Sequence, residues 1–208
     1  MMAIKNIVFD FGGVIVELDT QRPIDRFREI GVADAAELLD PYEQKGLFLE
    51  FEQGKVDLET FRQRLSAHAG KELTIDDIYY GWMGFMRDVP MYKLEYILAL
   101  RARYKVYILS NTNPVIMRWA KSPVFNPTGL PLTAYCEKIY ASYEIGLTKP
   151  DPAIFEYMLR DAGMDPAETL FVDDSRRNVE VGASLGMKTY LPGNEEDWRE
   201  AIGGLLED

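Results

Sequence analysis

An apolar run near the N-terminus, Ile7–Phe9, ends in the carboxylate of Asp10 and is followed by Gly12 and Gly13. Short, continuous apolar runs of this kind favour a strand buried on both faces, as in a parallel sheet. Asp10 then lies at the carboxyl end of that strand, where open α/β sheets bind their ligands. A buried charge there is costly unless a metal ion or a reaction uses it. The run therefore predicts a functional carboxylate at the edge of a parallel sheet.

Two later segments repeat this pattern. A second apolar run leads into Ser110 and Asn111, and a third leads into Asp173 and Asp174. Because the carboxyl ends of parallel strands meet at one edge of a sheet, we expect these side chains to lie beside Asp10. The sequence thus predicts a single site built from three strand ends.

The composition excludes several classes of function. A net charge of −11 over 208 residues argues against nucleic acid as a partner, since its phosphates are bound by clustered Lys and Arg. Cys136 and His68 are the only cysteine and histidine, so an intramolecular disulfide, a thiolate cage and a His-rich zinc site are excluded. We expect His68 to be a structural residue, in a helix distant from the strand ends.

Membrane association is not expected either. No apolar run approaches the length of a membrane span, and the N-terminus lacks the long apolar segment of a signal peptide. We therefore expect a cytoplasmic protein, and the sequence indicates no particular oligomeric state.

The chain divides into two kinds of pattern. Within residues 19–90, the stretch from about residue 20 to 87 carries helix signals, such as an N-cap at Asp57 and a closing glycine at Gly70, and it lacks strand-like runs. We expect this segment to be an all-helical cap inserted after the first strand, with residues 1–18 and 91–208 forming the core.

In the core, helical and strand-like segments alternate from residue 91 onward. A further helix is expected to begin at Asp151-Pro152 and to end at Gly163. Alternation of this kind is typical of βαβ units with a parallel sheet. The predicted fold is therefore α/β, a Rossmann-like three-layer core with a central parallel sheet and a small helical cap.

Four short motifs resemble, in order and spacing, those of the haloacid dehalogenase superfamily: Asp10-Phe11-Gly12-Gly13-Val14, Ser110-Asn111, Lys149-Pro150 and Asp173-Asp174. Each motif alone is weak evidence, but the four together span nearly the whole chain. The resemblance implies a Rossmann-like core with the helical segment where this family places its small cap. It also implies phosphoryl transfer to an aspartate.

The resemblance assigns a metal site to this chain. Asp10 would be the nucleophile that forms an aspartyl-phosphate. Mg²⁺ would be bound by Asp10, Asp174 and the backbone carbonyl of Gly12, with Asp173 coordinating directly or through water. Hard oxygen ligands of this kind are those that Mg²⁺ prefers. Asn178, one helical turn after Asp174, is a candidate to orient the metal-binding carboxylates.

The resemblance also assigns the phosphate contacts. Ser110 and the Asn111 backbone would donate hydrogen bonds to the phosphoryl oxygens, and Lys149 would balance their charge, as phosphoryl transfer requires. Taken singly, Ser110 and Asn111 are ordinary turn formers, Lys149 is a solvated lysine, and Asp173-Asp174 caps the next helix. Their joint occurrence with the nucleophile motif favours the catalytic interpretation.

One position departs from the family pattern. Most phosphatases of this family carry a second Asp two residues after the nucleophile, as general acid and base, and here that position is Gly12. A general acid is worth about 10²–10⁴-fold in rate. A sugar 1-phosphate, with its more acidic leaving group, would tolerate this loss. Residues 10–16 and 139–150 also resemble the bacterial α-D-glucose-1-phosphate phosphatases, and Asp19 or Glu17 is a candidate substitute acid.

Two other interpretations stay open. A metal-independent 2-haloacid dehalogenase also lacks the second Asp, although the Asp173-Asp174 pair favours Mg²⁺. A degenerate, non-catalytic family member would bind a phosphorylated ligand or a partner. The favoured hypothesis is a Mg²⁺-dependent phosphatase of a small phosphorylated metabolite, with a sugar phosphate as one candidate.

The helical segment holds the residues that would select the substrate. Its aromatic-rich stretch, Tyr79–Met86, is expected to form the core of the cap rather than a sugar-stacking surface. Because the sequence does not show which cap residues face the site, it does not identify the substrate.

Overall fold

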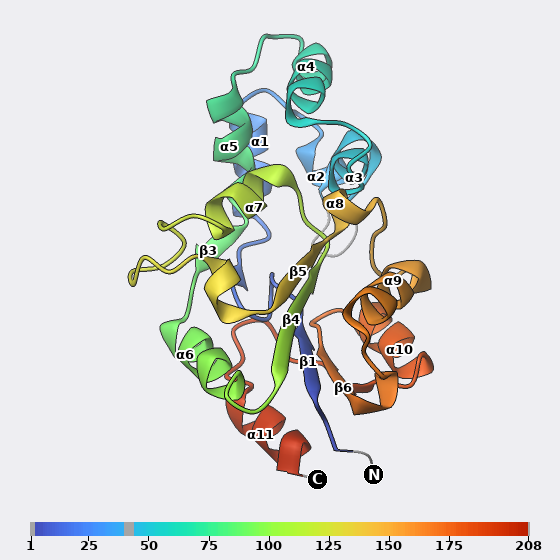
Figure 1. The fold of residues 1–208 in the computed structure, drawn as a ribbon. Coiled ribbons are helices and arrows are strands. Elements are labelled where there is room, and N and C mark those ends of the chain that lie inside the picture. The colour runs from blue at the N-terminus through green and yellow to red at the C-terminus, as the bar shows by residue number, and fades with distance from the viewer. Residues whose placement is uncertain (1–2, 40–43, 208) are drawn as a thin grey trace.

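The computed structural model describes residues 3–39 and 44–207. Its centre is a five-stranded sheet in the order β5-β4-β1-β6-β7, and all neighbouring pairs are parallel. Figure 1 shows this sheet running through the lower half of the molecule. In sheet order, the strands are β5 (Lys138–Ala141), β4 (Lys105–Ser110), β1 (Asn6–Phe9), β6 (Thr169–Val172) and β7 (Lys188–Tyr190).

The central strands are buried on both faces, as their apolar runs predict. All four residues of β1 and of β6 are buried. Successive side chains of a strand point to opposite faces. Accordingly, Ile7 and Phe9 belong to one apolar cluster, whereas Val8 belongs to a second cluster on the other side of the sheet.

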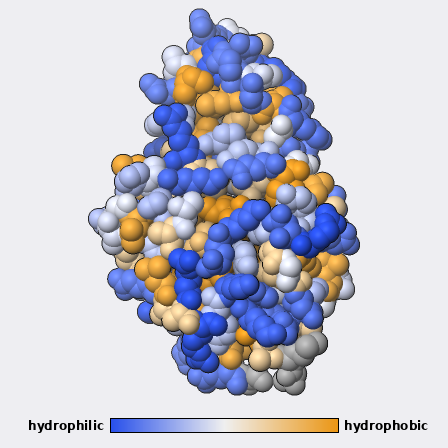
Figure 2. All heavy atoms as spheres, viewed as in Figure 1, coloured by the Kyte–Doolittle hydropathy of each residue, from blue (hydrophilic) through white to orange (hydrophobic). Residues whose placement is uncertain are grey.

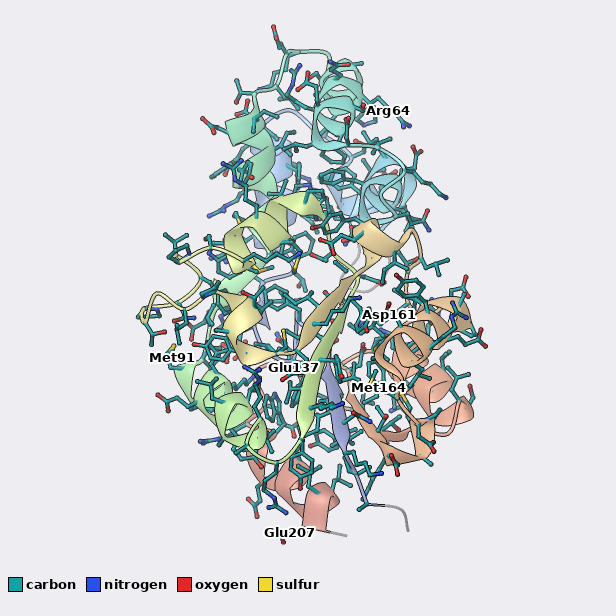
Figure 3. The ribbon with its side chains drawn as sticks, in the orientation of Figure 1. Arg64, Met91, Glu137, Asp161, Met164 and Glu207 are labelled. Atoms are coloured by element: carbon teal, nitrogen blue, oxygen red, sulfur yellow. The ribbon has the colours of Figure 1, made fainter. Side chains whose placement is uncertain are left out.

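Helices cover both faces of the sheet and complete the three layers. On one side lie α9 (Pro152–Ala162) and α10 (Arg176–Ser184), and on the other lie α6 (Met91–Leu100) and α11 (Arg199–Glu207) (Figure 1). Asp161, near the end of α9, accepts hydrogen bonds from the side chains of Lys138 and Tyr140 at 2.6 and 2.7 Å, which ties this helix to β5 (Figure 3). The predicted α/β fold is confirmed.

The remaining core elements are short. They are α7 (Pro114–Ala120), α8 (Ser142–Ile145) and the 3₁₀ turns Leu132–Tyr135 and Pro166–Glu168. Among the described residues, no helix combines the length and apolar character needed to cross a membrane. On the face shown in Figure 2, hydrophilic side chains predominate and the apolar ones form separate patches.

Five helices lie together at one end of the molecule (Figure 1). They are α1 (Arg22–Glu29), α2 (Ala35–Leu38), α3 (Gly46–Glu52), α4 (Leu58–Ala69) and α5 (Ile75–Trp82). The predicted ends of α4 are confirmed, since Asp57 accepts a hydrogen bond from the Thr60 amide and Gly70 adopts φ +67°. The limits of the cap, residues 19–90, stay a prediction.

Aromatic rings fill the interior of this helical segment. Trp82 is buried and packs against Phe27, Phe48, Phe51 and Phe61, with ring centroids 5.4–6.1 Å apart. Such ring pairs stabilise a core beyond the area they bury. The interpretation of the aromatic-rich stretch as cap core agrees with this packing.

A short antiparallel pair of strands joins the two ends of the helical segment. It consists of β2 (Glu17–Leu18) and β3 (Met86–Asp88). The expectation that residues 20–87 contain no strand is therefore wrong at Met86 and Arg87. These strands have only two and three residues and none is buried, so they leave no apolar alternation in the sequence.

Candidate active site

The predicted side chains meet at the carboxyl edge of the sheet. Asp10 follows β1, Ser110 is the last residue of β4, and Asp173 follows β6. The order β4-β1-β6 places Asp10 on the central strand of the three. Phe9 pairs in register with Ile108 and Val172, so β1 and β6 end at the same level, and β4 continues two residues further to Ser110.

Lys149 reaches this edge from the loop before α9. Its Nζ lies 2.9 Å from Oδ1 of Asp10 and 2.6 Å from Oδ2 of Asp173, and it donates to the carbonyl of Leu109 at 2.8 Å. The side chain is 1% exposed, which contradicts the alternative of a solvated surface lysine.

Asp173 is held rigidly below the surface. It is completely buried, and its Oδ1 accepts hydrogen bonds from the Ser175 amide and from Nδ2 of Asn178, both at 2.9 Å. With Lys149 on Oδ2, both carboxylate oxygens have donors. Asn178 thus occupies the orienting position expected of it, next to the carboxylates.

The site contains more carboxylates than positively charged groups. Ligand atoms of Asp10, Asp173 and Asp174 lie within 4.8 Å of one another, and Lys149 is the ammonium paired with two of them. Burial, together with the neighbouring carboxylates and against the opposing charge of Lys149, raises the pKa of Asp10 to about 8 and that of Asp174 to about 6. Three carboxylates and one ammonium leave an excess that a divalent cation with oxygen ligands would compensate. The donor set therefore fits Mg²⁺.

Gly13 has a specific geometric reason to be glycine. Its φ is +76°, and a Cβ at this position would lie 2.1 Å from Oδ2 of Asp174. Gly12, by contrast, does not have a positive φ, and a Cβ there would meet the flexible end of Leu18 at 2.9 Å. The absence of a side chain at Gly13 thus leaves room for the carboxylate of Asp174. At Gly12, the loop faces the flexible side chain of Leu18.

A cavity of about 60 Å³ adjoins these residues, between the sheet edge and the helical segment. Gly12, Ser110 and Thr112 line it from the core, and Glu52 and Trp82 line it from α3 and α5. Two buried polar atoms on its lining residues, Trp82 Nε1 and Thr112 Oγ1, have no hydrogen-bond partner within the described part of the chain. Such atoms are costly to leave unsatisfied, so they are candidates to bind a ligand.

Glu52 is the site residue that the sequence reasoning missed. It is 7% exposed, and burial, followed by the charge of Asp10, raises its pKa to about 8 against the opposing charge of Lys149. A signal for it exists, because Phe48, Phe51 and Glu52 are spaced to share one face of a helix. A glutamate on an apolar helix face marks a buried acid.

The two carboxylates suggested as substitute acids lie elsewhere. Asp19 is half-buried and accepts hydrogen bonds from the amides of Gln21 and Arg22 at 3.0 and 2.8 Å. The bond from Arg22 is the main cause that lowers the pKa of Asp19, which makes it a poor proton donor near neutral pH. Glu17 lies in β2, outside the residues that line the cavity.

The parallel sheet, the helical segment beside it and the carboxylates around a buried lysine are the fold and the site of a hydrolase of the haloacid dehalogenase type. The family of haloacid dehalogenase-like hydrolases matches residues 4–186, and the chain belongs to that family. D-ribitol-5-phosphate phosphatase of Bacteroides thetaiotaomicron is 49% identical over 203 residues, which cover 98% of each chain.

Solved structures agree with this membership. A predicted hydrolase of the family from Porphyromonas gingivalis matches with a TM-score of 0.96 and 46% identity over 100% of both chains. A family enzyme from Bacteroides thetaiotaomicron, in complex with magnesium and inorganic phosphate, matches with a TM-score of 0.88 and 39% identity over 96% of this chain and 100% of that one. The resemblance to the glucose 1-phosphate phosphatase branch is not confirmed by these relatives.

Proposed function

We propose that this chain is a Mg²⁺-dependent phosphatase whose substrate is the phosphate ester of a small polyol or sugar. The observation that carries the proposal is the buried contact of Lys149 with Asp10 and Asp173, beside Asp174. This arrangement provides a nucleophile, a metal-binding set and a fixed positive charge at one point, which phosphoryl transfer requires.

Asp10 would attack phosphorus. Its Oδ1 accepts hydrogen bonds from the Phe11 amide at 2.6 Å and from Lys149, so the carboxylate is oriented and Oδ2 remains for the attack. Ser110 and the Asn111 backbone would donate to the phosphoryl oxygens, and Lys149 would offset their charge. Attack forms an aspartyl-phosphate, which water then hydrolyses.

Mg²⁺ would be held by Asp10, Asp174 and the Gly12 carbonyl, with Asp173 bound directly or through water. When bound, the ion neutralises the charge that develops on the phosphoryl oxygens. The described donors are oxygens and carry excess negative charge, which supports this choice of metal.

The substrate class rests on two observations. The relative with 49% identity over 98% of both chains is named for D-ribitol 5-phosphate. In addition, two residues that line the cavity carry buried polar atoms without a described partner, Nε1 of Trp82 in the helical segment and the hydroxyl of Thr112 in the core. Hydroxyl groups of a polyol would give these atoms partners.

The proposal is tested by phosphate release from ribitol 5-phosphate, ribose 5-phosphate, glucose 1-phosphate, glucose 6-phosphate and 4-nitrophenyl phosphate. Each is assayed with Mg²⁺, with a chelator and with the Asp10→Asn variant. We expect Mg²⁺-dependent turnover, highest in kcat/KM for a pentose or pentitol 5-phosphate and abolished in the variant. Halide release from a 2-haloacid without Mg²⁺ would favour the dehalogenase interpretation, and phosphate binding without turnover would favour a non-catalytic protein.

A further inference from the structure

The proposed substrate creates a chemical problem at Gly12. A primary alcohol is a poor leaving group, so its ester needs a proton donor as the P–O bond breaks. Glycine offers none at the position where most phosphatases of this family carry an acid. The proton must then come from another residue of the cavity.

We infer that Glu52 is the general acid and base of this reaction, supplied by the helical segment in place of the absent aspartate. The inference rests on the proposed phosphatase function. Glu52 and Gly12 line the same cavity, which lies between α3 and the sheet edge. Among the described residues that line this cavity, Glu52 is the only one with a carboxyl group.

The surroundings of Glu52 are unusual for a structural glutamate. Its carboxyl has no hydrogen bond or ion pair with any residue of the described ranges, although the residue as a whole is only 7% exposed. The charged groups that act on it are Asp10 and Lys149 of the catalytic cluster. A buried carboxyl without a partner is costly, and such groups gather at functional sites.

The protonation state suits an acid. Burial and the negative charge of Asp10 raise the pKa of Glu52 to about 8, so the carboxyl is mostly protonated at neutral pH. The efficiency of a general acid is greatest when its pKa lies near the working pH. Glu52 therefore enters the reaction with a proton to donate.

The two steps balance in protons and electrons. As Oδ2 of Asp10 forms its bond to phosphorus, the ester P–O bond breaks and Glu52 donates its proton to the leaving alcohol oxygen. Glu52, now a carboxylate, then takes a proton from the water that attacks the aspartyl-phosphate. The acyl phosphate P–O bond breaks, inorganic phosphate leaves, and Asp10 and Glu52 return to their initial states.

The test compares two leaving groups in the Glu52→Gln variant. For ribitol 5-phosphate we expect kcat/KM to fall about 10²–10⁴-fold, because the alkoxide must leave without a proton. For 4-nitrophenyl phosphate, whose leaving group needs no proton, the first chemical step should be unchanged. Slow hydrolysis of the aspartyl-phosphate should then produce a burst of nitrophenol. Glu50→Gln is the matched control, since Glu50 lies in the same helix, is paired with Arg64 at the surface and should retain full activity.

Several outcomes separate the possible failures. Equal losses of kcat/KM for both esters, or no loss of kcat/KM for the alkyl ester, would overturn the role of Glu52. Neither result would contradict the proposed phosphatase function. Absence of Mg²⁺-dependent turnover in the unmodified protein would instead overturn the proposed function. A second measurement needs no variant: kcat for the alkyl ester should decline above about pH 8 while phosphorylation by the aryl ester does not. Matching profiles would contradict the assignment even if the variant failed to fold.

Discussion

Asn111 and Lys149 hold each other through two reciprocal hydrogen bonds. Nδ2 of Asn111 donates to the carbonyl of Lys149 at 2.8 Å, and the amide of Lys149 donates to Oδ1 of Asn111 at 2.8 Å. The side chain of one loop thus pairs with the backbone of the other in the manner of a strand. Asn111 therefore positions Lys149, in addition to the backbone contact with phosphate proposed for it.

Replacing this asparagine should misplace the lysine. In Asn111→Ala, we expect kcat to fall about 10–100-fold and the free energy of unfolding to fall by about 1–3 kcal/mol, because two backbone groups lose their partners. Steady-state kinetics and urea unfolding measure the two effects. Asn194→Ala, at an exposed position with only long hydrogen bonds to Leu18, is the control and should change neither. Unaltered kcat in Asn111→Ala would contradict the positioning role.

Removing the charge of Lys149 should reduce activity and stability more than removing the hydrogen bonds with Asn111 that position it. Lys149→Met leaves the buried carboxylates of Asp10 and Asp173 without their ammonium. We expect activity to be lost and the metal-free protein to be destabilised by about 3–5 kcal/mol at neutral pH. Chemical unfolding at pH 9 and pH 6 tests the cause, since Asp10, whose pKa is raised to about 8, is ionised at the higher pH and protonated at the lower one, where the deficit should be smaller. A deficit that is independent of pH would point to lost packing instead.

The stability of the metal-free protein should decrease as pH rises. The pKa values of Asp10 and Glu52 are raised to about 8 and that of Asp174 to about 6, so the folded state binds more protons than the unfolded chain between pH 4 and 8. The unfolding free energy therefore falls with increasing pH over this window. In thermal unfolding with a chelator, Tm should be higher at pH 5.5 than at pH 8, by about 2–4 °C per kcal/mol.

Mg²⁺ should reverse that trend. The ion favours ionised ligands, so its stabilisation should be greatest at pH 8 and small at pH 5.5. Thermal scans with and without 10-fold changes in Mg²⁺ concentration measure this dependence. A metal-free Tm that increased with pH would show that the carboxylates are not held together as described.

Substitutions at Gly13 and Gly129 can distinguish backbone strain from a clash with Asp174, the proposed metal ligand. Both have φ +76°, but a Cβ at Gly129 meets nothing within 4 Å, whereas at Gly13 it would overlap Asp174. Gly129→Ala should cost about 1–3 kcal/mol of stability with full activity. Gly13→Ala should cost at least as much and also weaken Mg²⁺ binding, as measured by calorimetry and by the Mg²⁺ dependence of kcat. Equal Mg²⁺ affinity in the two variants would refute the clash.

A carboxylate placed at Gly12 should relieve the need for Glu52. The three heavy atoms nearest to a Cβ at Gly12 all belong to the flexible side chain of Leu18, so aspartate can be introduced there at modest strain. We expect Gly12→Asp to restore alkyl-phosphate hydrolysis about 10–100-fold in the Glu52→Gln background, within the range of a general acid. Rescue by Gly12→Asn as well would indicate a structural effect, and the assay is the same phosphate release.

Much of the core could be predicted from the sequence because its signals are local. The apolar runs that end at Asp10 and Asp173 mark strands that are fully buried, and Asp57 and Gly70 mark the ends of α4. Each of these signals depends on a few adjacent residues. Chain order then determines which strand ends meet at one edge.

The features that could not be predicted depend on contacts between segments that are distant in the sequence. Glu52 is 42 residues from Asp10 in the sequence. Nothing in the sequence of α3 alone shows that Glu52 lies near Asp10 and Lys149. The role of Lys149 was likewise indicated only by the family resemblance, and its burial was not predicted. The strands β2 and β3 are too short and too exposed to carry a pattern.

The three contacts of Lys149 have a consequence for what the enzyme can accept at this position. An ammonium has three N–H bonds, and here one points to each of Asp10, Asp173 and the Leu109 carbonyl. No N–H remains to donate to an arriving anion. Lys149 therefore acts on a phosphate by long-range electrostatic attraction, unless it breaks one of these three hydrogen bonds. An arginine, whose planar fork directs its donors differently, would keep the charge and break this threefold geometry. Position 149 thus requires the geometry of an ammonium, and a positive charge alone is not sufficient.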